Sequence, residues 1–215
     1  MATARREKRA TERRNRDEEV LEAAIKLFYE KGYPASSIQD VADVVGVLKG
    51  SLYHYISSKE DLLFRILQQS HEQARAIMDE VSELDTSTLE RLDEFLRRMY
   101  VWYLSNIERV SLYFNQGQYL TGERRTEMRA QGRDFRQYVR DLVAAAKEDG
   151  HLRADLDIKL AASFVLGALN SIPMWYRTSG THSPDFIARE FAQMSLNALR
   201  PTPATNRQKR SAPAR

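Results

Sequence analysis

Residues 36–56 read SSIQDVADVVGVLKGSLYHYI, and this stretch decides the fold. Its apolar positions 38, 41, 42 and 45 recur at the i, i+3, i+4, i+7 spacing that places side chains on one face of a short helix. Gly46 follows that helix directly, and glycine readily takes the left-handed conformation of a helix end. Leu52, Tyr55 and Ile56 then form a second apolar stripe. Two short helices joined by a tight turn predict a helix-turn-helix.

The second helix keeps a largely polar outer face once its apolar stripe is buried. Hydroxyl, ammonium and imidazole groups suit phosphate oxygens and base edges in a DNA major groove, and Gly50 permits close approach to the DNA backbone. The alternative is a solvated surface helix that happens to be polar. The candidate DNA-binding residues on this helix are Leu48, Lys49, Gly50, Ser51, Tyr53 and His54.

Two serines have the S-x-x-E/Q spacing of a capping box, in which paired side chains satisfy free backbone N–H groups at a helix start. Ser36 with Gln39 opens the first helix, and Ser57 with Glu60 opens a third. The third helix start, together with Lys59, forms an anion site suited to a DNA phosphate. Ser36, Gln39 and Lys59 therefore join the DNA-binding candidates. The alternative is that both boxes serve capping and nothing more.

The same region resembles the DNA-binding domain of the TetR family of transcriptional repressors. The resemblance covers about residues 16–65 with order and spacing intact, and it implies a dimer. Leu48 departs from the pattern, because the family often has Ser or Thr there. A leucine either contacts a thymine methyl group or merely packs, which leaves the base preference open. The resemblance rests on GYPASS (32–37), IQDVA (38–42), GVLKGSLYHY (46–55) and SKEDLL (58–63).

Composition limits the classes of protein and site. The chain has 215 residues, 42% of them hydrophobic, which is enough for a sizeable core. It has no cysteine, which excludes disulfides, thiolate zinc sites and cysteine nucleophiles. We expect no apolar run near the ~18–20 residues of a membrane span and no signal peptide, and hence a cytoplasmic protein without metal or cofactor.

The net charge of +3 is divided unevenly along the chain. Residues 1–16 carry +5, residues 200–215 carry +5, and the part between them carries −7. We expect 1–16 to be a flexible basic arm that lies along the DNA minor groove, or else a solubilising tail. Residues 200–215 contain three prolines and are expected to be disordered.

Helical spacing without a convincing strand pattern predicts an all-α protein. A first helix is expected from Asp17 to about Lys31, and the helix that opens near Ser58 continues to about Val81 as a lever. A polar break follows, and Ser87 with Glu90 forms another capping box. The predicted parts are a basic arm, a helix-turn-helix domain with its lever, a ligand-binding and dimerisation domain and a tail: 1–16, 17–81, 82–199 and 200–215.

The last two predicted helices have more apolar surface than one subunit needs. One opens at Asp155 or Asp157 and carries a wide apolar face through Ile172. The other starts at Ser183-Pro184, because proline suits a first helical position. We expect these two helices to form a four-helix arrangement across a two-fold axis. The alternative is that they only complete the monomer core.

A surplus of aromatic residues in 82–199 predicts an apolar ligand pocket between helices. Pro173 is expected to kink its helix at Asn170 and to free the carbonyl of Leu169. For any single aromatic residue the alternative is ordinary core packing. The candidate ligand-binding residues are Phe95, Met99, Trp102, Tyr113, Phe114, Tyr138, Asn170, Trp175 and Arg177.

Residues 166–170 (LGALN) and 174–177 (MWYR) are similar to the equivalent helix of TetR-family regulators of fatty-acid and sterol breakdown. Those regulators respond to acyl-coenzyme A thioesters. The similarity implies a long apolar pocket, with Arg177 or another arginine meeting phosphates near the surface. The alternative is a helix end packed by Trp175 and Tyr176 at the dimer edge.

The leading hypothesis is a repressor that binds palindromic operator DNA as a dimer and is released by a hydrophobic effector, an acyl-CoA thioester among the candidates. A regulator of drug efflux that binds aromatic or cationic compounds is the second. A sequence-tolerant architectural DNA protein predicts weak base dependence instead. A helical enzyme is disfavoured, because the four histidines are dispersed and no catalytic motif is present.

Overall fold

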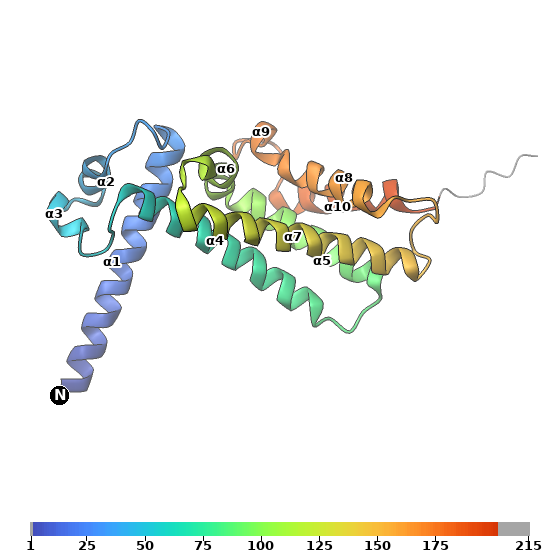
Figure 1. The fold of residues 1–215 in the computed structure, drawn as a ribbon, viewed down its shortest axis with the longest axis horizontal. Coiled ribbons are helices and arrows are strands. Elements are labelled where there is room, and N and C mark those ends of the chain that lie inside the picture. The colour runs from blue at the N-terminus through green and yellow to red at the C-terminus, as the bar shows by residue number, and fades with distance from the viewer. Residues whose placement is uncertain (1, 202–215) are drawn as a thin grey trace, which may run out of the picture.

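The computed structural model describes residues 2–201, with the side chains of 14–201, and this part of the chain is all-α (Figure 1). A headpiece lies at one end of an elongated molecule, and long helices run from it to the other end. The helices are α1 (Ala2–Glu30), α2 (Ile38–Val45), α3 (Lys49–Leu52), α4 (Lys59–Ser82), α5 (Thr88–Ser105), α6 (Ile107–Gln116), α7 (Gly122–Glu148), α8 (Ile158–Asn170), α9 (Ile172–Trp175) and α10 (Pro184–Leu199), with a 3-10 turn at Gly117–Tyr119.

α1 corrects the expectation of a flexible arm at 1–16, because the helix begins at Ala2 and is continuous to Glu30. The reason is local propensity. Residues 2–16 contain neither glycine nor proline and are rich in Ala, Arg, Lys and Glu, which are strong helix formers. Figure 1 shows this helix projecting away from the rest of the headpiece. The predicted tail lies outside the described residues from 202 onward.

The first residues of α2 and α4 are each one position later than their predicted capping boxes imply. At α2 the N-cap is Ser37, and its capping box is closed by Asp40. At α4 the N-cap is Ser58, whose side chain accepts from the backbone N–H of Asp61. The boxes expected at Ser36 with Gln39 and at Ser57 with Glu60 are therefore wrong. The predicted N-caps Ser87, Asp157 and Ser183 are confirmed.

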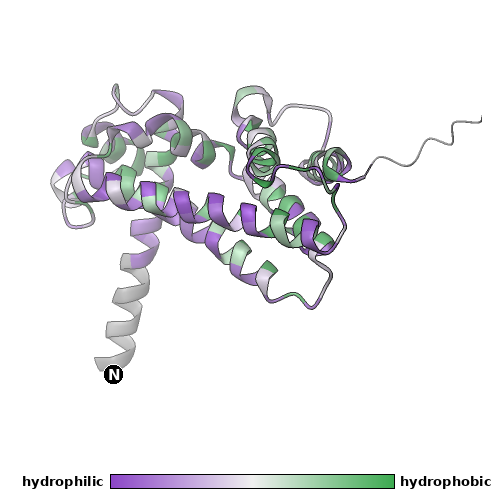
Figure 2. Ribbon diagram, turned by 45° about the vertical axis from the view of Figure 1, so that its right-hand side comes forward, coloured by the Kyte–Doolittle hydropathy of each residue, from purple (hydrophilic) through white to green (hydrophobic). Residues whose placement is uncertain are grey.

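Two hydrophobic cores share helices instead of dividing at residue 82. The headpiece core is built from α1 to α4, and it also takes in Leu112 of α6 and Leu120 from the turn before α7. The second core is built from α5, α7, α8 and α10, and it also takes in Ala74, Met78 and Val81 from the far half of α4. Figure 2 shows hydrophobic and hydrophilic residues interspersed along these helices. α4 and α6 therefore connect the two parts mechanically.

Pro173 breaks its helix where only a kink was expected. α8 ends at Asn170, and α9 is a separate turn in which Pro173 occupies one of the first two positions. The missing N–H and the fixed φ of proline suit such a helix start. By length and composition alone, Ile158–Trp175 could cross a membrane, which corrects the expectation that no run is long enough. The break at Ser171 interrupts this stretch.

Candidate functional site

The short helices α2 and α3 are held at a fixed angle by the turn between them. Gly46 has φ of 74°, and its N–H bonds back to the end of α2, so a residue with a Cβ would be strained there. Val47 N–H donates to the Ala42 carbonyl at 3.0 Å, which closes the turn. Leu52 and Ile56 are buried beneath α3. This burial leaves the opposite face of α3 exposed.

Arg65 on α4 fixes the segment that follows α3. Its Nη1 donates to the Tyr55 carbonyl at 2.9 Å, and its Nη2 forms an ion pair with Asp17 on α1. One guanidinium thus joins three elements of the headpiece through planar hydrogen bonds. The position of α3 relative to α1 and α4 is therefore set by both packing and charge.

The exposed surface around α3 carries most of the predicted DNA-binding residues. Leu48 is 80% exposed, so it does not pack within the chain, and Tyr53 is 52% exposed. Lys49, Gly50 and His54 are also exposed, and Ser51 is partly so. The helix itself is only four residues long, shorter than expected, because Leu48 supplies no side-chain cap and Gly50 weakens its interior. Backbone-bonded turns continue the segment to Ile56.

Two predicted DNA-binding side chains, those of Ser36 and Lys59, form hydrogen bonds within the headpiece. Ser36 is buried, and its hydroxyl donates to the Gly32 carbonyl at 2.7 Å. Lys59 Nζ donates to the Ser36 carbonyl at 2.6 Å and lies 4.3 Å from the centre of the Tyr33 ring. Burial lowers the pKa of Lys59. Both side chains fasten the loop before α2, so these contacts do not support the prediction that they bind DNA.

Gln39 stays exposed on α2 and donates to Asp43 Oδ1 at 2.7 Å. The hydrogen bond lies along the helix surface, so the amide remains accessible. Gln39 is thus exposed on the helix that precedes α3, like the α3 residues themselves. We call Gln39, 48–51, Tyr53 and His54 the exposed headpiece surface.

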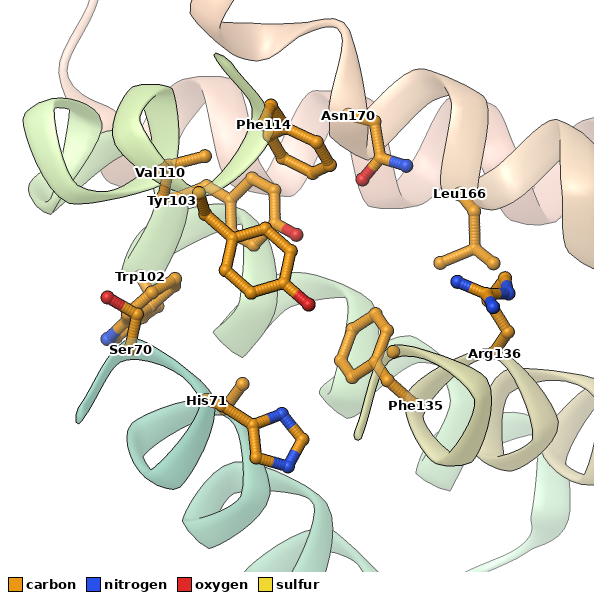
Figure 3. Close-up of a pocket in the computed structure, with 13 residues that line it drawn as sticks. Ser70, His71, Trp102, Tyr103, Val110, Phe114, Phe135, Arg136, Leu166 and Asn170 are labelled. Atoms are coloured by element: carbon orange, nitrogen blue, oxygen red, sulfur yellow. The ribbon is translucent and has the colours of Figure 1, made fainter. Parts of the chain in front are cut away.

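A second candidate site is a cavity of about 100 Å³ where five helices, α4 to α8, meet (Figure 3). It is smaller than the long pocket that the second resemblance implied, and smaller than the ~300–1,000 Å³ of typical ligand pockets. Aromatic rings form most of its wall. The lining residues are Ser70, His71, Ala74, Trp102, Tyr103, Val110, Tyr113, Phe114, Gly132, Phe135, Arg136, Leu166 and Asn170.

Four of the nine predicted ligand-binding residues line this cavity: Trp102, Tyr113, Phe114 and Asn170. Phe95 and Met99 are fully buried core residues behind it. Tyr138 donates its hydroxyl to the Met78 carbonyl at 2.9 Å, away from the cavity. Trp175 stacks on Phe191 with 5.2 Å between ring centres, and Arg177 donates to the neighbouring Tyr176 carbonyl. These five predicted ligand-binding residues do not line this cavity.

Sequence reasoning missed nine lining residues. The helical spacing of Ser70, His71 and Ala74 on α4, and of Gly132, Phe135 and Arg136 on α7, could have indicated one shared face. Small and polar residues on such a face are a usable signal, because a packed helix crossing would bury large apolar groups there. Tyr103, Val110 and Leu166 carry no signal that separates them from core residues.

The polar side chains of the cavity are neutral except for one cation. Burial raises the pKa of the Tyr103 and Tyr113 hydroxyls, and burial lowers the pKa of His71, so all three are neutral at neutral pH. Arg136 is the cation of the lining, and no Asp or Glu belongs to the lining among the described residues. Hydrogen-bonding groups thus sit within a mostly apolar wall and next to one positive charge.

α6 links this cavity to the headpiece. Val110, Tyr113 and Phe114 of α6 line the cavity, whereas Leu112 of the same helix is buried in the headpiece core. Tyr113 also packs against the headpiece core. A shift of α6 that accommodates a ligand must therefore disturb headpiece packing.

A polar contact joins the first turns of α4 and α7. Glu60 Oε1 accepts from Thr121 N at 2.8 Å and from Thr121 Oγ1 at 3.0 Å. Arg124 Nη2 donates to Asp61 Oδ1 at 2.7 Å, and its guanidinium lies over the Phe64 ring. We call these residues the α4–α7 latch. The latch couples α7, which lines the cavity, to the helix that follows the exposed headpiece surface.

Comparison with known proteins gives these two sites a context. Residues 20–66 match the family model described as bacterial regulatory proteins, tetR family. Residues 85–199, more than half of the chain, match the model of the tetracyclin repressor-like C-terminal domain.

Individual relatives agree with the family models. The repressor KstR2 of Rhodococcus jostii RHA1 is 28% identical over 182 residues, covering 84% of this chain and 89% of the relative. The structure of the ketosteroid regulator KstR2 of Mycobacterium tuberculosis has a TM-score of 0.82 and 26% identity, covering 87% and 96% of the two chains. AibR in complex with isovaleryl coenzyme A and operator DNA has a TM-score of 0.75 and 24% identity, covering 86% and 98%. The chain therefore belongs to the TetR family of transcriptional repressors, whose members are regulators and not enzymes.

Proposed function

We propose that the chain is a dimeric cytoplasmic repressor that binds a palindromic operator and is released by a hydrophobic small molecule, with acyl-CoA thioesters as the candidate class. The observation that carries the proposal is α6, which lines the cavity with one face and enters the headpiece core with another. A ligand in the cavity thus acts directly on the packing that positions α3.

The exposed headpiece surface supports operator binding. It combines an ammonium group at Lys49, hydroxyls at Ser51 and Tyr53, and a bare backbone at Gly50. Phosphate contacts by such groups set the position on the duplex, and contacts to base edges supply the sequence preference. The exposure of Leu48 supports a contact of its side chain with a thymine methyl group.

α8 and α10 support a dimer. Leu160 is 70% exposed and Phe164 53% exposed on α8, and Met194 is 54% exposed on α10. These large apolar side chains face away from the chain's own cores. Burying them against a second copy of the chain removes them from water. The resulting dimer carries two headpieces, one for each of two half-sites about 34–36 Å apart.

The chemistry of the cavity supports a small effector with an apolar end. Aromatic walls with a few hydrogen-bonding groups are typical of such sites. The related KstR2 structure is titled a ketosteroid regulator, and the AibR structure holds isovaleryl coenzyme A within the same fold. The volume of about 100 Å³ favours a short or branched acyl group over a long chain or a ring system.

Release from selected DNA tests the proposal. Genomic fragments that the full chain retains are sequenced to define the operator, and operator affinity is then measured with isovaleryl-CoA, hexanoyl-CoA and palmitoyl-CoA. We expect a palindromic site and a loss of affinity of at least about fivefold with the shorter thioesters. Retention of fragments without a shared sequence would contradict operator recognition.

A further inference from the structure

We infer that the effector carries an anionic group, which the Arg136 guanidinium and the Tyr113 hydroxyl bind at the edge of the cavity. The inference rests on the proposed function in one respect, namely that the cavity holds an effector. It goes further by fixing the charge of that effector and the residues that bind the charge. It also excludes cationic compounds as the preferred class.

The first observation is the position of Arg136. Its side chain lines the cavity beside Leu166 (Figure 3), yet the residue is exposed, so the guanidinium lies where the cavity meets solvent. Among the side chains of residues 14–201, none forms a hydrogen bond or an ion pair with it. Its donors are therefore available to a ligand, and a guanidinium binds carboxylate and phosphate groups in bidentate fashion.

The second observation is Gly132, one turn before Arg136 on α7. A Cβ at this position would lie 3.3 Å from Arg136 Nη1 and 3.5 Å from Tyr113 Oη. The two polar groups thus converge on the space that a side chain would fill. Glycine inside a long helix costs about 1 kcal/mol relative to alanine, and the helix has no turn or positive φ here to explain it. Glycine at this position instead leaves room for the Arg136 guanidinium and the Tyr113 hydroxyl.

The third observation is the distribution of charge around the cavity. The carboxylates that act on His71 are those of Glu72, Glu127 and Asp134, and none of them lines the cavity. The lining contains no Asp or Glu among the described residues, and most of it is aromatic or aliphatic. An anion at that end gains a partner while its apolar part enters the cavity, whereas an ammonium group would face the guanidinium.

Four probes with the same six-carbon chain test the inference by calorimetric titration of the full chain. They are hexanoate, hexanoyl-CoA, 1-hexanol and hexylammonium. We expect at least one anionic probe to bind tenfold or more tightly than hexanol, and hexylammonium to bind most weakly. Tight binding of hexanoate but not of hexanoyl-CoA would identify a carboxylate as the bound anion. Tight binding of hexanoyl-CoA but not of hexanoate would identify the phosphates of coenzyme A. Equal affinity for hexanol and both anions, or no binding of either anion, would overturn the inference.

Matched variants assign the charge to a residue. R136Q is expected to lose about tenfold of the affinity for the anionic probe and none for hexanol. R133Q, an exposed arginine on the same helix outside the cavity lining, is the control and should match the parent chain. G132A is expected to weaken anion binding while thermal stability is kept, because its methyl group displaces the guanidinium. Equal behaviour of R136Q and R133Q would contradict the role of Arg136.

Failure of the proposed function would look different. Anion-selective binding that leaves operator affinity unchanged would contradict effector release and leave the charge assignment intact. Operator release by hexanol and hexanoate alike, at equal concentrations, would support release and contradict the charge assignment.

Discussion

Two lysines near the helix-turn-helix show how burial separates roles that look alike in sequence. Lys49 is exposed on α3, whereas Lys59 fastens the loop before α2 through the carbonyls of Pro34 and Ser36. Desolvation lowers the pKa of Lys59, but its hydrogen bonds keep the ammonium in place. One lysine is therefore available to DNA and the other is structural.

Substituting each lysine should separate these roles. K49A is expected to weaken operator and nonspecific DNA binding alike and to lower the salt slope by about one, with an unchanged midpoint of thermal unfolding. K59M is expected to cost about 1 kcal/mol of stability through its lost hydrogen bonds, with a nearly unchanged salt slope. Salt-dependent DNA titration and thermal unfolding measure both. The opposite pattern would contradict the assignment.

Asp40 makes the stability of the headpiece dependent on pH. Hydrogen bonds from Lys31 and Ser37 lower the pKa of its carboxyl to about 2. A lowered pKa in the folded state means that the contribution is complete above the unfolded value of 3.8 and is lost as the pH falls through about 2.

D40N should therefore lower the unfolding midpoint at pH 7 and at pH 5. The gap between D40N and the parent chain is expected to narrow between pH 4 and pH 2. D43N, an exposed neighbour on the same helix, is the control. A gap that stays constant down to pH 2 would contradict the role of the ionised Asp40.

The sequence placed the helix-turn-helix correctly because apolar spacing and Gly46 point to the same fold. It misplaced two caps because overlapping serines satisfy the same spacing, Ser36 or Ser37 in one case and Ser57 or Ser58 in the other. Tertiary contacts decide between them. At the start of α2, Gln39 bonds to Asp43 while Lys31 and Ser37 both bind Asp40. At the start of α4, Thr121 binds Glu60, and Asp61 accepts from the Ser57 N–H.

At the scale of elements, α6 and the α4–α7 latch are the parts that connect the cavity to the headpiece, and we propose that the response to effector passes through them. α4 contributes to both cores, so it cannot tilt at one end without moving at the other. The ion pair of Asp61 with Arg124 holds its first turn to α7. Coupling between two binding sites typically amounts to ~1–3 kcal/mol, which a few such contacts can transmit.

R124A should therefore reduce the response to effector more than it reduces either binding event. We expect operator affinity and effector affinity each to change by less than about threefold, while the loss of operator affinity on adding effector becomes severalfold smaller. R129A, an exposed arginine on the same helix, serves as the control. An unchanged response in R124A would show that coupling does not pass through the latch.

The elements differ in how well the sequence predicts them. The N-caps of α8 and α10 agree with prediction because cap residues and apolar faces reinforce one another. The cavity could not be located from aromatic residues alone. Phe95 and Tyr138 have the same spacing as lining residues, but Phe95 is fully buried in the core and Tyr138 packs against it. Which rings border a cavity depends on how five helices cross, and this crossing cannot be predicted from the residue spacing within any one helix.

At the scale of the whole molecule, the proposed palindromic operator requires two copies of the chain, one for each half-site. The exposed apolar face of α8 and α10 lies apart from the headpiece (Figure 1). A dimer formed there leaves both exposed headpiece surfaces accessible to one duplex. Affinity for a palindrome then depends on the dimer as much as on the headpiece.

F164E should dissociate this dimer, because it places a charge in an apolar interface. Analytical ultracentrifugation is expected to show a monomer of native helical content, and operator affinity is expected to fall at least tenfold. K159E changes an exposed charge on the same helix and should remain dimeric. A dimeric F164E would place the interface elsewhere on the molecule.

The central claim is that a ligand in the cavity controls operator binding, and one titration tests it most directly. Operator affinity of the full chain is measured with and without hexanoyl-CoA, at concentrations for which calorimetry has shown the cavity to be occupied. We predict a loss of affinity of at least about fivefold, corresponding to a coupling free energy near 1 kcal/mol. Unchanged operator affinity at full occupancy would contradict the claim.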